Sequence, residues 1–477
     1  MKNKILTGLL LVLIGGWGSL SAQNVGSNYA RQVNTLIGTK GVGLTSGYLY
    51  PGATYPYGMV QFTPSYFSKR SGFVINQLSG GGCEHMGNFP TFPVKGKLKM
   101  SPDNILNYRI NISEEKGHAG YYEAKVQEDI HAKLTVTERT GMASYEYPAD
   151  QQYGTVIIGG GISATPIEQA AIVITAPNKC EGYAEGGNFC GLRTPYKVYF
   201  VAEFDTDALE SGTWKRDELK PNTTFAEGEY SGVYFTFDVN KKKNIQYKIG
   251  VSYVSVENAR ENLKAENTGW DFLQIQNQAE SKWNHYLGKI EVEGSNPDRT
   301  TQFYTHLYRS FIHPNVCSDV NGEYMGADFR VHKSRSKHYT SFSNWDTYRT
   351  QIQLLSILDP EVASDIVISH QLFAEEAGGA FPRWVMANIA NAYAFGARNY
   401  DPKPIFKTMR KGAEEPGAMS QEVEARPGLK QYLDKGYYNA SIQLEYTSAD
   451  FAIAQFALHA VGDEFVSWRY FHFARSW

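Results

Sequence analysis

Four residues that could bind a ligand lie within five positions of one another: Trp345, Asp346, Tyr348 and Arg349. Apolar residues follow at helical spacing, so we expect one helix over 344–359, with Ser343 or Asn344 as its N-cap and Pro360 ending it. The first turn would place a carboxylate, which accepts hydroxyl hydrogen bonds, beside aromatic rings that can cover the apolar face of a polyol. The alternative is structural: an aspartate favoured by the helix dipole, with Arg349 as its ion-pair partner.

A second candidate is the glycine-rich stretch 78–93, which reads Leu-Ser-Gly-Gly-Gly-Cys-Glu-His-Met-Gly-Asn-Phe-Pro-Thr-Phe-Pro. Three consecutive glycines are costly to order, so we expect them where the backbone closely approaches another group. The loop lacks the Lys-Ser/Thr pair of a phosphate-binding loop. The alternative is a tight turn with solvated neighbours. If the loop binds a ligand, the contacts would come from five residues: Gly82, Cys83, Glu84, His85 and Asn88.

A third candidate is the pair Arg383 and Trp384, which follows Gly378-Gly-Ala-Phe-Pro382 at the start of a predicted helix. The pair could face a ligand at the helix start. Alternatively, the tryptophan packs in the core and the arginine extends its charge to solvent.

The elements that must position these residues differ between the two halves of the chain. Short alternating runs separated by turn residues predict a β-sandwich over 23–257, for example at Ala132–Thr137, Ala143–Tyr147, Thr155–Ile158, Tyr196–Phe204, Gly232–Val239 and Gln246–Val256. Residues 258–297 read as linker helices. Helical spacing then predicts an α-helical domain over 298–477, with helices near 303–311, 360–373, 382–393, 401–410 and 441–460.

The first 22 residues have the pattern of a secretory signal peptide, with two lysines, a short apolar run and small residues before Gln23. No later stretch is long and apolar enough to span a membrane, so we expect an exported protein, periplasmic or secreted, without an integral membrane segment after signal removal. The formal net charge is −3, so the excess of basic residues typical of nucleic-acid-binding proteins is missing and we expect no nucleic-acid partner.

Four cysteines could form disulfides after export: Cys83, Cys180, Cys190 and Cys317. Cys180 and Cys190 flank a glycine-rich segment and could pair, and Cys83 could pair with Cys317. Three connectivities are possible, and the sequence does not choose between them. No spacing of cysteine and histidine resembles a zinc site.

Several motifs, taken together, resemble the calcium-dependent exo-α-mannosidases of glycoside hydrolase family 92. They follow in the family's order across the chain: Val33-Asn-Thr-Leu-Ile-Gly-Thr39, Tyr50 to Pro64, Gly80 to Pro93, Phe303 to Arg309, Trp345-Asp-Thr-Tyr-Arg349, Pro382-Arg-Trp384, Arg426-Pro-Gly-Leu, Gly436-Tyr437 and Leu444-Glu-Tyr446. The resemblance implies an N-terminal β-sandwich packed on an (α/α)₆ barrel. It also implies removal of terminal α-mannose from mannose-containing glycans with inversion, assisted by Ca²⁺.

Inversion requires a carboxylic acid and a carboxylate base. The family's acid lies in an Asn-Glu-Pro motif and its base in an Asn-Asp-rich motif, and neither motif occurs up to Trp477. We therefore expect a truncated chain with an incomplete (α/α)₆ barrel, without catalytic residues, without most of the calcium site and inactive alone.

The resemblance assigns Asp346 to sugar-hydroxyl binding and gives the 82–88 loop a place in the same site, whereas the role of the Arg383–Trp384 pair stays open. A non-catalytic mannose-binding remnant is the alternative. A third possibility, catalysis by Glu376 or Glu445, lacks a recognisable acid motif.

Overall fold

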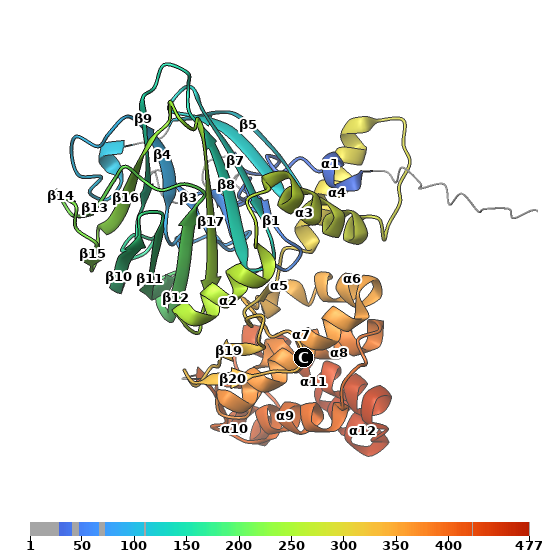
Figure 1. Cartoon of the computed structure of the whole chain (residues 1–477). Helices are drawn as coiled ribbons and strands as arrows, with labels where there is room; N and C mark the ends of the chain where they lie inside the picture. The colour runs from blue at the N-terminus through green and yellow to red at the C-terminus, as the bar shows by residue number, and fades with distance from the viewer. Residues whose placement is uncertain (1–27, 41–46, 66–71, 109–110, 422, 477) are drawn as a thin grey trace, which may run out of the picture.

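A computed structural model describes residues 28–40, 47–65, 72–108, 111–421 and 423–476 of the chain. The predicted signal peptide lies outside these residues. Within them, two sheets form a β-sandwich, and a helical domain follows in sequence (Figure 1). The fold class predicted from the sequence, a β domain followed by a helical domain, is therefore confirmed. None of the helices in these ranges has the length and apolarity needed to cross a membrane.

The first sheet has eight strands joined by antiparallel pairing. In spatial order they are β1 (Ala53–Thr54), β2 (Gln61–Pro64), β3 (Phe73–Val74), β4 (Thr91–Lys95), β9 (Tyr153–Ile158), β16 (Ser231–Asp238), β13 (Glu210–Lys215) and β14 (Glu218–Pro221).

The second sheet has nine strands and is also antiparallel. Their spatial order is β15 (Phe225–Glu227), β10 (Ile167–Ala176), β11 (Lys179–Phe189), β12 (Leu192–Phe204), β17 (Asn244–Ser252), β8 (Thr140–Glu146), β7 (Ile130–Val136), β6 (Tyr121–Val126) and β5 (Ile112–His118). Burial alternates along β6, as the period of two requires for a strand with one face toward the core. The predicted strand that was to end at Val256 ends at Ser252, because Ser255 caps the next helix.

The core between the sheets is strongly aromatic. Phe62 and Phe73 pack edge to face, and Phe204 contacts Phe235 and Tyr247 with ring centroids 4.9 and 5.3 Å apart. These rings are buried, so the high aromatic content of the sequence is used largely for packing in this half.

Two helices connect the halves, α2 (Val256–Glu266) and α3 (Phe272–Leu287). Ser255 and Asp271 cap them by accepting backbone N–H groups of the first turn. Helix α2 lies against β17 and β12, and α3 lies against β7. Together with α1 (Tyr29–Gln32) and α4 (Pro297–Ser310), α3 lies beside the sandwich (Figure 1). The boundaries predicted near residues 257 and 297 remain predictions.

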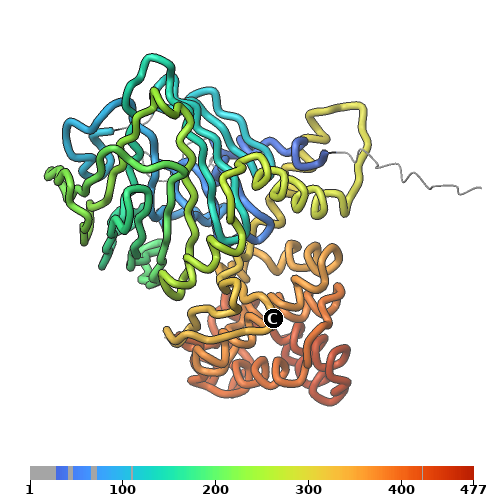
Figure 2. The backbone as a smooth tube through the Cα atoms, viewed as in Figure 1, coloured from blue at the N-terminus to red at the C-terminus, as the bar shows by residue number. Residues whose placement is uncertain are grey.

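The helical domain lies below the sandwich in Figure 2, where its ribbon runs from orange to red. It contains α5 (Asn344–Thr347), α6 (Gln351–Leu358), α7 (Pro360–Glu376), α8 (Arg383–Phe395), α9 (Pro402–Glu414), α10 (Leu429–Lys435), α11 (Ala440–Phe456), a π-helical turn (Ala457–Val461) and α12 (Glu464–Phe473). Three two-stranded pairs accompany them: β18 (Asn315–Val316) with β21 (Tyr339–Thr340), β19 (Glu323–Met325) with β20 (Val331–Lys333), and β22 (Met419–Ser420) with β23 (Val423–Glu424).

The helices predicted after residue 298 are present, but the single helix expected over 344–359 is wrong. It is divided into α5 and α6, and the peptide bond between Arg349 and Thr350 is cis. The carbonyl of Tyr348 accepts hydrogen bonds from the side chains of Gln353, at 2.8 Å, and Asn391, at 3.1 Å. These side chains replace the backbone N–H that would bond to this carbonyl in a continuous helix, so the carbonyl keeps hydrogen-bond partners at the break.

Candidate active site

The glycine-rich loop is held closed by one histidine. The ring of His85 is 2% exposed; its Nε2 accepts a hydrogen bond from the backbone N–H of Leu78 at 2.8 Å, and its Nδ1 lies 2.6 Å from the carbonyl oxygen of Cys83. Since one ring nitrogen accepts and the other faces a carbonyl, the imidazole is the neutral Nδ1–H tautomer. Burial lowers the pKa of the His85 imidazole below its usual value, which also favours the neutral ring. A Cβ at Gly81 would lie 2.9 Å from this ring, which explains why the loop needs glycine there.

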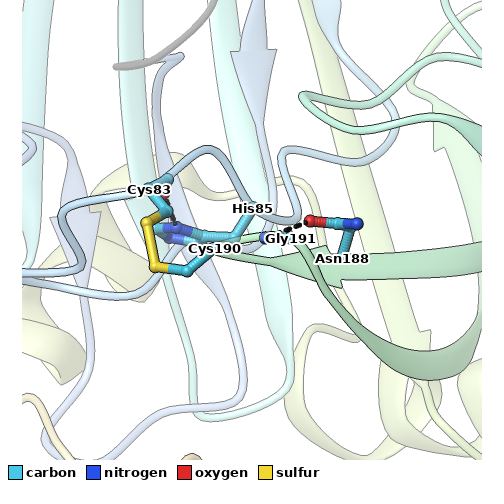
Figure 3. Close-up of a disulfide and its surroundings, with 5 residues drawn as sticks. All are labelled: Cys83, His85, Asn188, Cys190 and Gly191. Carbon is cyan, nitrogen blue, oxygen red and sulfur yellow. Dashed lines mark hydrogen bonds between the residues drawn. A yellow bond between two sulfur atoms is a disulfide. The ribbon is translucent and has the colours of Figure 1, made fainter.

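A disulfide fastens the same loop to the sandwich. Cys83 is bonded to Cys190 at the turn between β11 and β12, as Figure 3 shows. Neither pairing suggested from the sequence forms, and Cys180 and Cys317 are buried free thiols. The segment between Cys180 and Cys190 is strand β11 rather than a loop, and ten residues of extended strand separate these two cysteines by about 33 Å.

Asn88 lies at the buried base of the loop. Its side-chain oxygen accepts hydrogen bonds from Asn76 Nδ2 at 3.0 Å and from the Tyr196 hydroxyl at 2.6 Å. In return, Asn76 Oδ1 accepts the backbone N–H of Asn88 at 2.8 Å. Asn88 and His85 therefore shape the loop from inside, whereas Gly82 and Glu84 are exposed on it.

The loop reaches the helical domain through His313. The backbone N–H of Ser79 donates to His313 Nε2 at 2.7 Å. Desolvation lowers the pKa of this histidine to about 4, so its ring is neutral and can accept that bond. The carbonyl of His313 accepts a hydrogen bond from Gln351 Nε2 at 3.0 Å, at the first residue of α6. His313 thus joins the glycine-rich loop to the segment that follows Trp345 and Asp346.

Helix α5 presents its candidate residues to solvent. Trp345 is 57% exposed and Asp346 is exposed beside it, with its carboxylate accepting a hydrogen bond from the Ser343 hydroxyl. Arg349 is exposed, and its guanidinium lies 4.7 Å from the ring centroid of Tyr348. A carboxylate and a large ring are therefore side by side and accessible.

Helix α8 supports α5 from below. Asn388 Nδ2 donates to the backbone carbonyl of Asn344 at 3.0 Å and to its side-chain oxygen at 2.7 Å. Arg383, at the start of α8, forms an ion pair with Glu445 of α11 and lies 4.6 Å from the ring centroid of Trp384. Both residues of the pair at the start of α8 are half-buried.

Hydrogen bonds through His313 therefore link the start of the glycine-rich loop to α6, which follows the Trp345–Arg349 motif, and α8 packs against α5. Sequence reasoning missed His313, Gln351 and Asn388, which hold the motifs in place. The dipeptide His313-Pro314 indicates an extended or turn conformation after a predicted helix, but this local signal does not reveal which residues His313 contacts.

One group of side chains is close enough to hold a metal ion among the described residues: Asp328, His332 and Glu376. Calcium takes six to eight oxygen ligands. This group offers one imidazole and only two carboxylates, which is too few oxygen ligands. The group does not fit the calcium ion that the family resemblance implies.

The chain therefore joins a β-sandwich to a helical domain, with an accessible carboxylate and indole on α5. Comparison with known families identifies both domains. The glycosyl hydrolase family 92 N-terminal domain matches residues 32–252, and the glycosyl hydrolase family 92 catalytic domain matches residues 258–477. The chain belongs to glycoside hydrolase family 92.

Individual relatives are distant in sequence. An uncharacterized secreted glycosidase of Arthroderma benhamiae is 26% identical over 474 residues, which cover 90% of this chain and 58% of the relative. A family 92 α-mannosidase from Bacteroides thetaiotaomicron has a TM-score of 0.83 at 23% identity, over 94% of this chain and 65% of its own. A family 92 inverting mannosidase from Bacteroides thetaiotaomicron VPI-5482 has a TM-score of 0.80 at 23% identity, over 94% and 64%. These matches share the fold, and this chain spans less than two thirds of each relative.

Proposed function

We propose that this chain is part of an exported exo-α-mannosidase that removes terminal α-linked mannose from glycans with inversion and with the help of Ca²⁺. The observation that carries the proposal is the hydrogen-bonded link through His313 between the glycine-rich loop and the segment that follows Trp345 and Asp346, in a chain of family 92. The names of two matched solved structures, an α-mannosidase and an inverting mannosidase, support mannose as the sugar. The disulfide between Cys83 and Cys190 is consistent with export.

The accessible groups at the junction suit one terminal sugar. The carboxylate of Asp346 can accept hydrogen bonds from two neighbouring hydroxyl groups, and the exposed ring of Trp345 can cover an apolar ring face. Glu84 and the backbone at Gly82 can contact the sugar from the opposite side. The hydrogen bonds that His85 and His313 accept from the backbone of the loop hold it in one conformation, so little conformational entropy is lost when a sugar binds.

We propose that the general acid and base come from outside this chain and that the chain alone is inactive. The two carboxylates that could replace them are held by other groups. Glu376 accepts hydrogen bonds from the Tyr324 hydroxyl and the Ala327 N–H, at 2.7 and 2.9 Å, and Glu445 is paired with Arg383. The calcium requirement rests on the family alone.

The test compares the complete gene product with residues 23–477 on α-linked mannobiosides. We expect release of β-mannose, observed by NMR as the first anomer formed, from the complete product and none from the shorter chain. Loss of activity with a chelator and its return with Ca²⁺ would support the metal requirement. A complete product that leaves every α-mannobioside intact would refute the proposal.

A non-catalytic mannose-binding role of this chain is the second candidate. It is favoured by the accessible Trp345 and Asp346 in a chain whose Glu445, a conceivable catalytic carboxylate, is paired with Arg383. Calorimetry of residues 23–477 with mannose and mannobiose tests it: binding without turnover supports this role, and the absence of binding refutes it.

A further inference from the structure

The β19–β20 hairpin meets the C-terminal end of α7 at a cluster of three side chains. One potential ligand atom each of Asp328, His332 and Glu376 lies within 4.8 Å of the others. We propose that these residues bind a divalent transition-metal ion, with Zn²⁺ the best fit, and that the ion ties the hairpin to α7. The proposal is independent of the proposed glycosidase activity.

The first observation is that the three side chains converge on a single glycine. A Cβ added to Gly326 would lie 2.6 Å from His332 Cδ2, 2.8 Å from Asp328 Oδ1 and 2.8 Å from Glu376 Oε2. Side chains from the turn, from β20 and from α7 therefore converge beside the backbone of Gly326, and a side chain at this position would push them apart. An ion pair of Asp328 with His332 would not by itself bring in Glu376, which lies 44 residues after His332.

The donor set selects the kind of metal. One imidazole and two carboxylates are typical ligands of Zn²⁺, and three protein ligands leave a coordination position for water. Ligand atoms around one tetrahedral Zn²⁺ lie about 3.3 Å apart, given bonds of about 2.0–2.1 Å. His332 Nε2 and Asp328 Oδ1 are 2.9 Å apart, which is close to that spacing. All three ligand atoms lie within 4.8 Å of one another, so a carboxylate has to approach by at most about 1.5 Å.

Surrounding donors already orient the carboxylates. Glu376 Oε1 accepts from the Tyr324 hydroxyl at 2.7 Å, its Oε2 accepts from the Ala327 N–H at 2.9 Å, and Asp328 Oδ1 accepts from the Arg330 N–H at 3.1 Å. Outer contacts of this kind fix metal ligands and leave a second lone pair on each oxygen of Glu376, whereas at Asp328 Oδ1 the ion would replace the hydrogen bond with His332 Nε2. The three ligands are half-buried, so an ion can enter from solvent.

A bound ion would stabilise the segment of the chain that leads into the candidate active site. Tyr324 stacks on His338 with ring centroids 3.7 Å apart, and Phe342 stacks on His370 at 3.9 Å. Residues 338–342 lead directly into α5. Fixing the hairpin would therefore stabilise the packing under this segment, and the expected effect of the metal is on stability.

The test uses the full chain freed of metal with a chelator and then titrated with ZnCl₂, MnCl₂ and CaCl₂ by calorimetry. Two variants remove ligands, Glu376→Gln and His332→Gln, and two matched controls change exposed residues outside the cluster, Glu375→Gln and His306→Gln. We expect one Zn²⁺ per wild-type chain, weaker Ca²⁺ binding, and a loss of Zn²⁺ affinity of about 100-fold or more in the ligand variants only.

A second readout does not depend on the variants. Co²⁺ bound to the wild-type chain should give visible d–d absorption, which Zn²⁺ should displace at one equivalent, and Zn²⁺ should raise the melting temperature. Absence of Zn²⁺ and Co²⁺ binding by the wild-type chain would overturn the proposal. Equal weakening in the control variants would also overturn it, because the ion would then be bound elsewhere.

Discussion

Removing the disulfide between Cys83 and Cys190 should destabilise the β-sandwich and loosen the glycine-rich loop. The bond joins residues 107 positions apart. In the chain-entropy description, closing a loop of that length in the unfolded chain contributes about 4.7 kcal/mol at 25 °C. Residual structure in the unfolded state lowers this value, so we expect a loss of about 3–4 kcal/mol in the free energy of unfolding.

The assay is urea unfolding of wild-type chain and of Cys83→Ser, Cys190→Ser and the double variant, read by hydrogen exchange of amides in β9 and β16. Either single change already opens the bond, so all three variants should lose about the same free energy. Exchange at Leu78 and Ser79 should also quicken, because His85 and His313 accept these two N–H groups.

Two controls separate the cross-link from the loss of a thiol. A reductant should destabilise the wild-type chain but leave Cys83→Ser unchanged. Cys317→Ser, in which the hydroxyl can keep the hydrogen bond to the carbonyl of His338, should cost less than about 1 kcal/mol. Single variants as stable as the wild-type chain, or a double variant that loses the sum of both, would refute the reasoning.

Further predictions concern the helical domain. Arg426→Met should cost about 3–5 kcal/mol, because it leaves the carboxylate of Asp450 buried without its partner at 2.7 Å, and adding Asp450→Leu should restore most of it; an unfolding curve equal to wild type would contradict this. Burial lowers the pKa of His338 and of His370 to about 3, so each binds a proton in the unfolded chain before it does in the folded chain. The free energy of unfolding should therefore fall as the pH drops from about 6.5 toward 3, by up to about 1.4 kcal/mol per pH unit for each histidine. The His370→Gln variant should show a flatter dependence of the urea midpoint on pH than the wild-type chain. Equal pH dependence in the two proteins would contradict the prediction. Trp468 is 69% exposed on α12, so Trp468→Lys should reduce binding of a hydrophobic dye at unchanged melting temperature, and undiminished dye binding would place the apolar surface elsewhere.

The repeating patterns in the sequence were sufficient to predict a β domain followed by a helical domain. Alternation along strands such as β6 and helical spacing along α7 and α11 are local signals that burial on one face produces. The break between α5 and α6 could not be predicted in this way, because it depends on Asn391, which is 43 residues from the Tyr348 carbonyl it contacts. Local propensity there is helical, and a tertiary contact overrides it.

The residues of the candidate site stay a prediction, and the contacts that hold them in place could not be predicted from the sequence. Glycines in series indicated a close backbone approach, and the partner that approaches Gly81 is the ring of His85 from the same loop. The disulfide partner of Cys83 could not be chosen, because strand β11 was interpreted as a loop. His313 contacts Ser79 across 234 residues, a separation at which one sequence carries no signal.

The central claim is that Asp346 binds the hydroxyl groups of a terminal α-mannose at the domain junction. The most direct test is kcat/KM for an α-mannobioside with the complete gene product and its Asp346→Ala variant, with Asp298→Ala, an exposed aspartate in the first turn of α4, as the matched control. Two lost charge-assisted hydrogen bonds, each contributing about 1.5–3 kcal/mol, predict a fall of at least about 100-fold in the Asp346 variant and little change in the control. A variant with nearly wild-type kcat/KM would contradict the claim and leave Asp346 with the structural role of a helix-terminal aspartate.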